Sequence, residues 1–167
     1  MTQYFDIDPI VVNALHIEDK ETRRIALESM QILIRITPVH ELGRYLQMDV
    51  DLTVLNILRN QDLDHHIKSL CIKIISNLSA ADGYQDVVKV KPYLPQRLLD
   101  QGLMEFIMYT LKEFPNERIT SDLFHTLLNL ILDEQSQKQL PRIVTPEFIK
   151  VTLTYINASD NVVYALH

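Results

Sequence analysis

The chain has 167 residues, of which 47% are apolar, and this content is enough for a folded core and excludes a mainly disordered chain. Its formal net charge of −6 lacks the basic balance that general nucleic-acid binding needs, so no direct nucleic-acid partner is expected. Only 3 glycines and 7 prolines interrupt a sequence rich in leucine and isoleucine, which favours long helices over the many turns of a sheet protein. The expected class is all-α.

The cellular setting follows from the cysteine count and from the first residues. Cys71 is the single cysteine, so neither an internal disulfide nor a cysteine-based zinc site can form. It lies in the densest apolar run and is expected to be a buried thiol. No apolar run is long enough to span a bilayer, and the acidic start MTQYFDIDP does not resemble a secretion signal. We expect an intracellular protein, in the cytoplasm or the nucleus, with no membrane partner.

The first half of the chain predicts short helices that alternate with long ones. Asp8 and Pro9 are expected to open a short helix to about residue 17, and Asp19 to cap a long helix over 20–36. A short helical segment over 39–48 follows, then a short helix that Asp51 caps and that runs through 58. A long helix beginning at Asp62 or Asp64 and ending near 81 completes the pattern. The expected core stripe of the first long helix is Ile25, Ser29, Ile32, Leu33 and Ile36.

The second half begins with a less regular stretch over 83–101, where we expect a short helix, an interruption and a short turn over 96–100. Helices are then predicted from about 102 to 112 and over 117–132. Thr145 and Pro146 are expected to open a short helix through 156. Residues 159–167 look like the beginning of a further long helix.

The long helices repeat one another. The sequence of the first long helix aligns with that of the second at an offset of 42 residues. The second long helix aligns with the third at an offset of 52 residues. The shorter helices over 105–111 and 147–153 are again 42 apart. With the offset of 42, Ile25, Ile32 and Ile36 align with Ile67, Ile74 and Leu78. With the offset of 52, Ile67, Ile72, Ile75, Asn77 and Leu78 align with Ile119, Phe124, Leu127, Asn129 and Leu130.

A helical period near 42 is typical of armadillo and HEAT repeats. The stretch LLDQGLMEFIMYTLKE followed by NERITSDLFHTLLNLILD resembles the second and third helices of an armadillo repeat, and the sequence SNLS at 76–79 is similar to the end of the third helix. The resemblance implies a right-handed armadillo-like helical solenoid of about three repeats plus a partial fourth. The implied repeats of this single domain, 1–167, are 8–48, 49–95, 96–141 and a partial 142–167.

In such a solenoid, the polar face of each long helix lines the inner curve, where a ligand is expected. On the three long helices this face reads Arg24, Glu28, Gln31 and Arg35; His66, Leu70, Lys73 and Asn77; and Arg118, Asp122, His125 and Asn129. Because it leans basic, it would suit an extended acidic or phosphorylated peptide. The alternative is an ordinary solvated face. The predicted binding residues are Arg24, Arg35, His66, Lys73, Asn77, Arg118, His125 and Asn129.

Asn77 and Asn129 have an additional role by resemblance. In peptide-binding armadillo proteins, an asparagine at this point of the third helix holds the peptide backbone, since its amide can donate and accept at once. Tryptophans lie one turn earlier in those arrays, but here Lys73 and His125 occupy the positions and the chain has no tryptophan. Binding of a basic nuclear-localisation segment is therefore not the expectation.

No enzyme signature is present, and no catalytic residue, metal or cofactor is expected. The run DLDHH at 62–66 lies at a helix start, where acids serve as caps, and adjacent histidines point to different faces. The leading hypothesis is a non-catalytic module that binds a protein or peptide and belongs to a longer solenoid. The alternative is an assembly subunit that uses its outer surface and exposed repeat ends, with self-association through an uncapped C-terminal end.

Overall fold

The chain is all-helical, as predicted. The computed structural model describes residues 7–60, 64–79, 94–113, 117–131, 138 and 140–165, and their side chains except at 94–95, 113, 117–118 and 157–165. No strand occurs within these ranges. The helices are α1 (Asp8–Leu15), α2 (Lys20–Ile36), the 3-10 turn η1 (Val39–Glu41), α3 (Gly43–Gln47), α4 (Val50–Leu58), α5 (His65–Ser79), α6 (Leu94–Asp100), α7 (Leu103–Glu113), α8 (Glu117–Ile131), α9 (Leu140–Ile143) and α10 (Pro146–Ala165).

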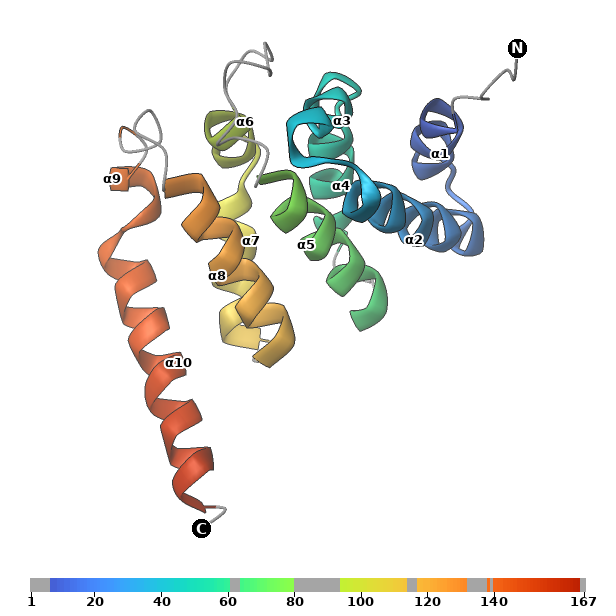
Figure 1. The fold of residues 1–167 in the computed structure, drawn as a ribbon. Helices are drawn as coiled ribbons and strands as arrows, with labels where there is room; N and C mark the ends of the chain where they lie inside the picture. Colours follow the sequence, from blue (N-terminus) through green and yellow to red (C-terminus); the bar gives the residue numbers. More distant parts are fainter. Residues whose placement is uncertain are drawn as a thin grey trace, which may run out of the picture.

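The long helices α2, α5 and α8 form one row, in which α5 packs against α2 on one side and against α8 on the other. The shorter helix α4 packs against α5 and α6, and α1 packs against α2. Helix α10 packs against α7. Figure 1 shows α1 and α2 at one end of the molecule and α9 and α10 at the opposite end. Within this row, α2 and α8 each contact one other long helix, whereas α5 contacts two.

The core runs through the row without a break. Leu27 and Met30 of α2, Ile74 and Leu78 of α5, and Leu130 of α8 are all fully buried. Burial of Leu and Ile side chains in contact with one another is the main stabilising contribution to such a fold. The predicted core residues of α5 are confirmed, since Ile67, Ile72, Ile75 and Leu78 are all buried.

Cys71 is buried in the same core, as predicted. Burial away from water disfavours the thiolate and raises the pKa of this thiol far above its ordinary value. Because the thiolate is the reactive form of cysteine, Cys71 serves as a packing residue in the folded chain.

Three of the predicted helix starts are confirmed by their hydrogen bonds. The Asp19 carboxylate accepts the Thr22 amide at 2.8 Å and caps α2. Asp64 accepts the Ile67 amide at 2.9 Å at the start of α5. In the same way the Thr145 hydroxyl accepts the Phe148 amide at 3.1 Å, ahead of α10. Each oxygen satisfies an amide that has no partner inside its helix.

The predicted cap at Asp8 is wrong. Ile7 is the N-cap of α1, and Asp8 is its first residue, with its side chain buried. The carboxylate instead binds the Arg44 guanidinium at 2.9 Å and accepts the Tyr45 hydroxyl at 3.3 Å. These contacts join α1 to α3, so an acid that could serve its own helix is used between helices.

The predicted cap at Asp51 is also wrong, and for the same reason. Asp51 lies inside α4, fully buried, and the N-cap is Asp49, which adopts a left-handed backbone at φ 55°. Arg97 of α6 donates through Nη2 to Asp51 Oδ1 at 2.9 Å and through Nε to Oδ2 at 3.1 Å. Arg97 Nη2 also reaches Asp49 Oδ1 at 2.7 Å.

This forked pair joins two helices far apart in the sequence. Arg97 is only 6% exposed and Asp51 is 0% exposed, so both groups have lost nearly all contact with water. Burial raises the pKa of Asp51, against the opposing effect of the nearby Arg97 charge. Two parallel N–H···O bonds compensate the lost hydration of each group, and they fix the position of α6 on α4.

Other boundaries differ in smaller ways. The helix expected to end at 156 continues to Ala165, because no glycine or proline interrupts 157–165. The turn expected over 96–100 is part of α6. The short helix expected within the irregular stretch falls on 83–93, outside the described residues. Gly102, the residue before α7, adopts a left-handed backbone conformation with φ 79°, which glycine accommodates without strain.

The expected core stripe of α2 is the clearest error. Ile25, Ile32 and Ile36 are 50%, 51% and 68% exposed, and Ser29 is half-buried. Leu33 alone of the five packs against the core, as predicted, and it is half-buried. The residues that face the core are instead Ala26, Leu27, Met30 and Ile34. Helix α2 is apolar on two sides, and the packing of α1 and α5 decides which side is buried.

We predict that Asp51→Ala destabilises the fold by about 3–5 kcal/mol, since it leaves the buried Arg97 charge without its forked partner. Urea unfolding at pH 7 measures the change. Asp49→Asn is the matched control, because asparagine tolerates the left-handed backbone of this residue, Asp49 is 65% exposed, and loss of its ion pair with the same guanidinium should cost less than about 1 kcal/mol. Equal losses for the two variants would contradict this assignment.

Candidate interaction surfaces

The predicted binding residues lie on α2, α5 and α8, but the structure gives them different surroundings. Arg35, His66 and His125 are exposed, while Arg24, Lys73, Asn77 and Asn129 are half-buried. The side chain of Arg118 lies outside the described part of the chain. The polar face is therefore present, and the contacts of its members decide which of them a ligand could reach.

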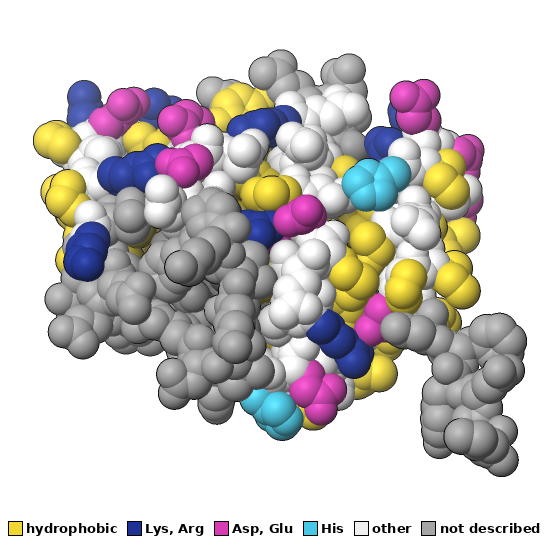
Figure 2. Space-filling model, turned by 90° about the horizontal axis from the view of Figure 1, so that it is seen from above, with side chains coloured by type: hydrophobic (Ala, Val, Ile, Leu, Met, Phe, Trp, Pro, Cys, Tyr) yellow, Lys and Arg dark blue, Asp and Glu magenta, His cyan; other side chains and the backbone are white. Residues whose placement is uncertain are grey.

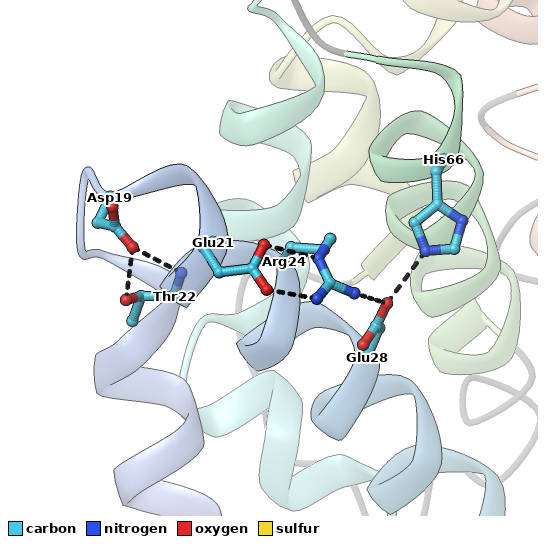
Figure 3. A network of polar contacts seen from close by, with 6 residues as sticks. All are labelled: Asp19, Glu21, Thr22, Arg24, Glu28 and His66. Atoms are coloured by element: carbon cyan, nitrogen blue, oxygen red, sulfur yellow. Dashed lines mark hydrogen bonds and ion pairs between the residues drawn. The ribbon is translucent and has the colours of Figure 1, made fainter.

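Arg24 and His66 already have acidic partners. Glu28 of α2 accepts Arg24 Nη1 at 2.5 Å and lies 3.1 Å from His66 Nε2 on α5, while Glu21 binds the other side of the same guanidinium (Figure 3). The hydrogen bond to His66 and the Arg24 charge lower the pKa of Glu28, and Arg24 likewise lowers that of Glu21. An acidic ligand would have to compete with these two carboxylates.

Asn129 is used inside the fold. Its Nδ2 amide donates to the carbonyl of Ser76 at 3.3 Å and to the hydroxyl of Ser79 at 3.1 Å, so it joins α8 to the last turn of α5. Asn77, the equivalent residue on α5, makes no hydrogen bond to another described residue. Of the two asparagines that resemblance assigned to a peptide, only Asn77 has its amide unoccupied by a described neighbour.

A smaller polar surface remains on α5 and α8, formed by Lys73, Asn77 and His125. Nearby in the sequence, Asp122 has one buried carboxylate oxygen with no hydrogen-bond partner among the described residues. Because that oxygen is buried, an external ligand does not reach it, but the Asp122 charge still does not favour an acidic ligand at this point. The surface is thus mixed in charge.

Sequence reasoning missed a second kind of surface, at the α2 end of the row. Ile25, Ile32 and Ile36 lie along one line of α2, since their spacings of 7 and 4 residues keep them within about 40° of each other around the helix. We call these three residues the α2 stripe. Exposed isoleucines that line up in this way form a patch rather than scattered single contacts.

Comparison with the equivalent residues of α5 explains why the α2 stripe is exposed. Its equivalents on α5, 42 residues later, are Ile67, Ile74 and Leu78, which are 7%, 0% and 0% exposed. Helix α5 has a long helix on each side, whereas α2 has only α5. The same positions are therefore buried on α5, which has two long neighbours, and exposed on α2, which has one.

The opposite end carries a matching feature. Ile149, Leu153 and Ile156 of α10 are 45%, 55% and 46% exposed and lie on one side of the helix; we call them the α10 stripe. The equivalents of the first two on α7, Ile107 and Leu111, are buried. Seen from above, hydrophobic side chains lie on the surface at both ends of the molecule (Figure 2).

Several hollows lie beside α7. One of about 460 Å³ is formed with α10 and includes the Lys112–Glu147 ion pair at 2.9 Å. Another, of about 440 Å³, includes Met108 and Arg142. A third, of about 360 Å³, lies towards α4 and α5 and includes Lys68. We assign no chemistry to them, because none of the three places a nucleophile beside a base.

Comparison of the chain with protein-family models, with curated proteins and with solved structures gave no match. In the described part of the chain, no helix combines the length and the apolar character needed to cross a bilayer. No three His, Cys, Asp or Glu side chains of that part gather closely enough to hold a metal ion. The function is therefore inferred from the polar and apolar surfaces described above.

We predict that Glu28→Gln lowers stability at pH 7 and not at pH 3. The pKa of Glu28 is lowered in the folded chain, so its contribution is present above the ordinary value of 4.5 and is lost as the pH falls through the folded value. Urea unfolding of both proteins at pH 7, 5 and 3 tests this. The control is Glu18→Gln, which removes an exposed glutamate charge outside the cluster.

We further predict that Asn129→Ala destabilises the chain by about 1–3 kcal/mol, because both hydrogen bonds from its amide are lost. Asn77→Ala, at the equivalent position of α5, should cost less than about 0.5 kcal/mol. Thermal unfolding followed by circular dichroism measures both. If Asn129→Ala left stability unchanged, its contacts with α5 would not be structural.

Proposed function

We propose that this chain is a non-catalytic assembly module, an armadillo-like helical solenoid that joins protein chains through the apolar faces at its two ends. The main observation is that both ends of the molecule expose an apolar stripe, on α2 and on α10, whose described equivalents on α5 and α7 are buried. Exposed apolar patches of this kind favour a protein partner.

The repeat supports the solenoid part of this proposal. The three long helices that pack in a row are the three that match at offsets of 42 and 52 residues. In a solenoid each repeat buries an apolar face against the next, so a terminal repeat without a polar cap keeps that face open. We propose the repeats 8–48, 49–95 and 96–141, with a partial fourth over 142–167.

A second candidate function is the binding of an extended acidic or phosphorylated segment along α5 and α8. It is favoured by Lys73, Asn77 and His125, which lie on two helices in direct contact and are not used by the described ion pairs. It is the weaker candidate, because Arg24 and His66 are matched by Glu21 and Glu28.

The setting we propose is intracellular, in the cytoplasm or the nucleus, with no cofactor. A single cysteine that is buried and not paired is typical of proteins in a reducing compartment. Any enzymatic turnover by the purified chain would overturn the non-catalytic part of the proposal.

The two candidates differ in which substitutions remove partners. We expect Ile32→Glu on α2 or Leu153→Glu on α10 to lower the recovery of at least one specific partner about tenfold or more in quantitative pull-downs, because each buries a charge in an apolar contact. Lys73→Glu combined with His125→Glu should leave that recovery unchanged.

All four altered residues are exposed or half-buried, so the folded state of each variant can be verified by its unaltered thermal unfolding. The opposite result, in which the Lys73 and His125 changes remove the partner and the end-face changes do not, would replace the first candidate by the second.

A further inference from the structure

The three hollows beside α7 join into one path. The hollow towards α4 and the middle hollow, beside α9, share Glu105 in their walls. The middle hollow and the hollow formed with α10 share Lys112 and Glu147. The three therefore lie next to one another, from Arg59 on α4, across α7, to Lys150 on α10. We call this path the α7 groove.

We propose that the α7 groove binds an extended peptide segment of another protein, with an acidic residue at each end and apolar residues between them. An extended segment presents its side chains at regular intervals, and the three hollows offer places for them in succession. The groove does not include the apolar stripes of α2 and α10, so it adds a second binding surface to the assembly role proposed above.

The size of the groove fits such a segment. The three hollows measure about 360, 440 and 460 Å³, each within the range of about 300–1,000 Å³ that is usual for binding sites. The path from α4 over α7 to α10 crosses two spacings between packed helices, or about 16–20 Å. At about 3.3 Å per residue, a segment of about five or six residues covers that distance.

The middle of the groove fits apolar side chains. Met104 and Met108 of α7 line the middle hollow and are half-buried, and a methionine side chain adapts its shape to an apolar partner. Leu111 and Val151 continue the apolar wall into the hollow at α10. Glu105 lines the middle hollow as well, which disfavours a carboxylate of the ligand at this point. The central residues of the segment are therefore apolar.

Charge places the acidic residues at the two ends. The basic side chains in the walls of the groove are Arg59, Lys68, Lys112, Arg142 and Lys150. Glu105 and Glu147 are the acidic ones. The groove is therefore basic, although the formal net charge of the whole chain is −6. Such a local reversal of charge favours an acidic ligand.

Ion pairs within the chain show which cations a ligand can use. Lys112 binds Glu147 at 2.9 Å, and Arg142 binds Asp100 at 2.8 Å, so these two are matched. Arg59 and Lys150 are exposed and form no ion pair with a carboxylate of the described residues. Because Arg59 is on α4 and Lys150 is on α10, one such cation lies at each end of the groove.

The cation at the α4 end is held in position before a ligand arrives. Arg59 Nη1 donates to Asn56 Oδ1 at 3.2 Å, and Nη2 donates to the carbonyl of Gln101, just ahead of α7. A guanidinium has five N–H groups, so these two contacts leave others for a carboxylate. Lys68, only 8% exposed, lines the same hollow and adds a second positive charge. A carboxylate is favoured at this end.

At the α10 end, two ammonium groups act on one place. The hydrogen bond and the charge of Lys112, together with the charge of Lys150, lower the pKa of Glu147. The positive potential that stabilises this carboxylate also favours a second carboxylate, from a ligand, beside Lys150. The second acidic residue of the segment is therefore placed here, about five or six residues from the first.

Selection from a displayed library of random peptides of about ten residues, with the purified 167-residue chain as the target, tests the α7 groove. The selected peptides should carry two acidic residues about five or six positions apart, with apolar residues between them. A synthetic peptide of the selected sequence should bind in fluorescence anisotropy. Replacement of both its acids by lysine should raise the Kd at least about tenfold.

Substitutions in the chain locate the bound peptide. Lys150→Glu and Arg59→Glu should each raise the Kd at least about tenfold. Lys20→Glu, the same change at an exposed lysine of α2, is the matched control and should leave the Kd unchanged. In Lys150→Glu, a peptide with one of its two acids replaced by lysine should bind again, and which acid does so gives the direction of the segment. Thermal unfolding verifies that each variant is folded.

A library that yields no peptide with two separated acids would overturn the α7 groove as a peptide site. Peptide binding that Lys73→Glu removes and Lys150→Glu leaves intact would do the same, because it places the peptide on α5 and α8. Failure of the proposed assembly role is distinguishable. In that case Ile32→Glu leaves the recovery of protein partners unchanged, while the selected peptide still binds in the groove.

Discussion

The structure depends on one constraint, which is that each long helix needs another long helix packed on each of two sides. Helix α5 meets this need between α2 and α8, and its apolar residues are buried. Helix α2 does not, and three isoleucines remain at its surface. Because burial of apolar area is the main stabilising contribution, the exposed apolar residues of α2 and α10 leave an attractive surface at each end of the molecule. The end-face interactions proposed for this chain follow from that incomplete burial.

Charged groups have a different role, since they fix which helices meet. Asp8 and Asp51 each pair with an arginine on another helix instead of capping their own, and the Asp51–Arg97 pair is almost fully removed from water. A buried pair of this kind adds little net stability compared with apolar packing, but breaking it is costly. It therefore makes one arrangement of α4 and α6 much more favourable than alternatives. The Glu28 contact does the same more weakly between α2 and α5.

These pairings also change how the polar face is interpreted. A face with several basic residues suggests an acidic ligand only if the charges are not matched within the chain. Arg24 and His66 are matched by Glu28, which contacts both (Figure 3). Asn129 donates to α5 and not to an external peptide backbone. What remains at Lys73, Asn77 and His125 is a smaller surface than sequence spacing implied.

The sequence by itself determined the helices, because apolar spacing, caps such as Asp19 and Asp64, and the 42-residue repeat are local or periodic properties of the chain. It also identified the core of α5, where both flanking helices exist. Only the tertiary structure decided the exposed face of α2 and the partners of Asp51 and Glu28. An amphipathic pattern shows that one side of a helix will be buried, and a carboxylate shows that a hydrogen-bond donor is needed. The segment that buries the apolar side, or that donates to the carboxylate, is set by packing between parts of the chain that are distant in sequence.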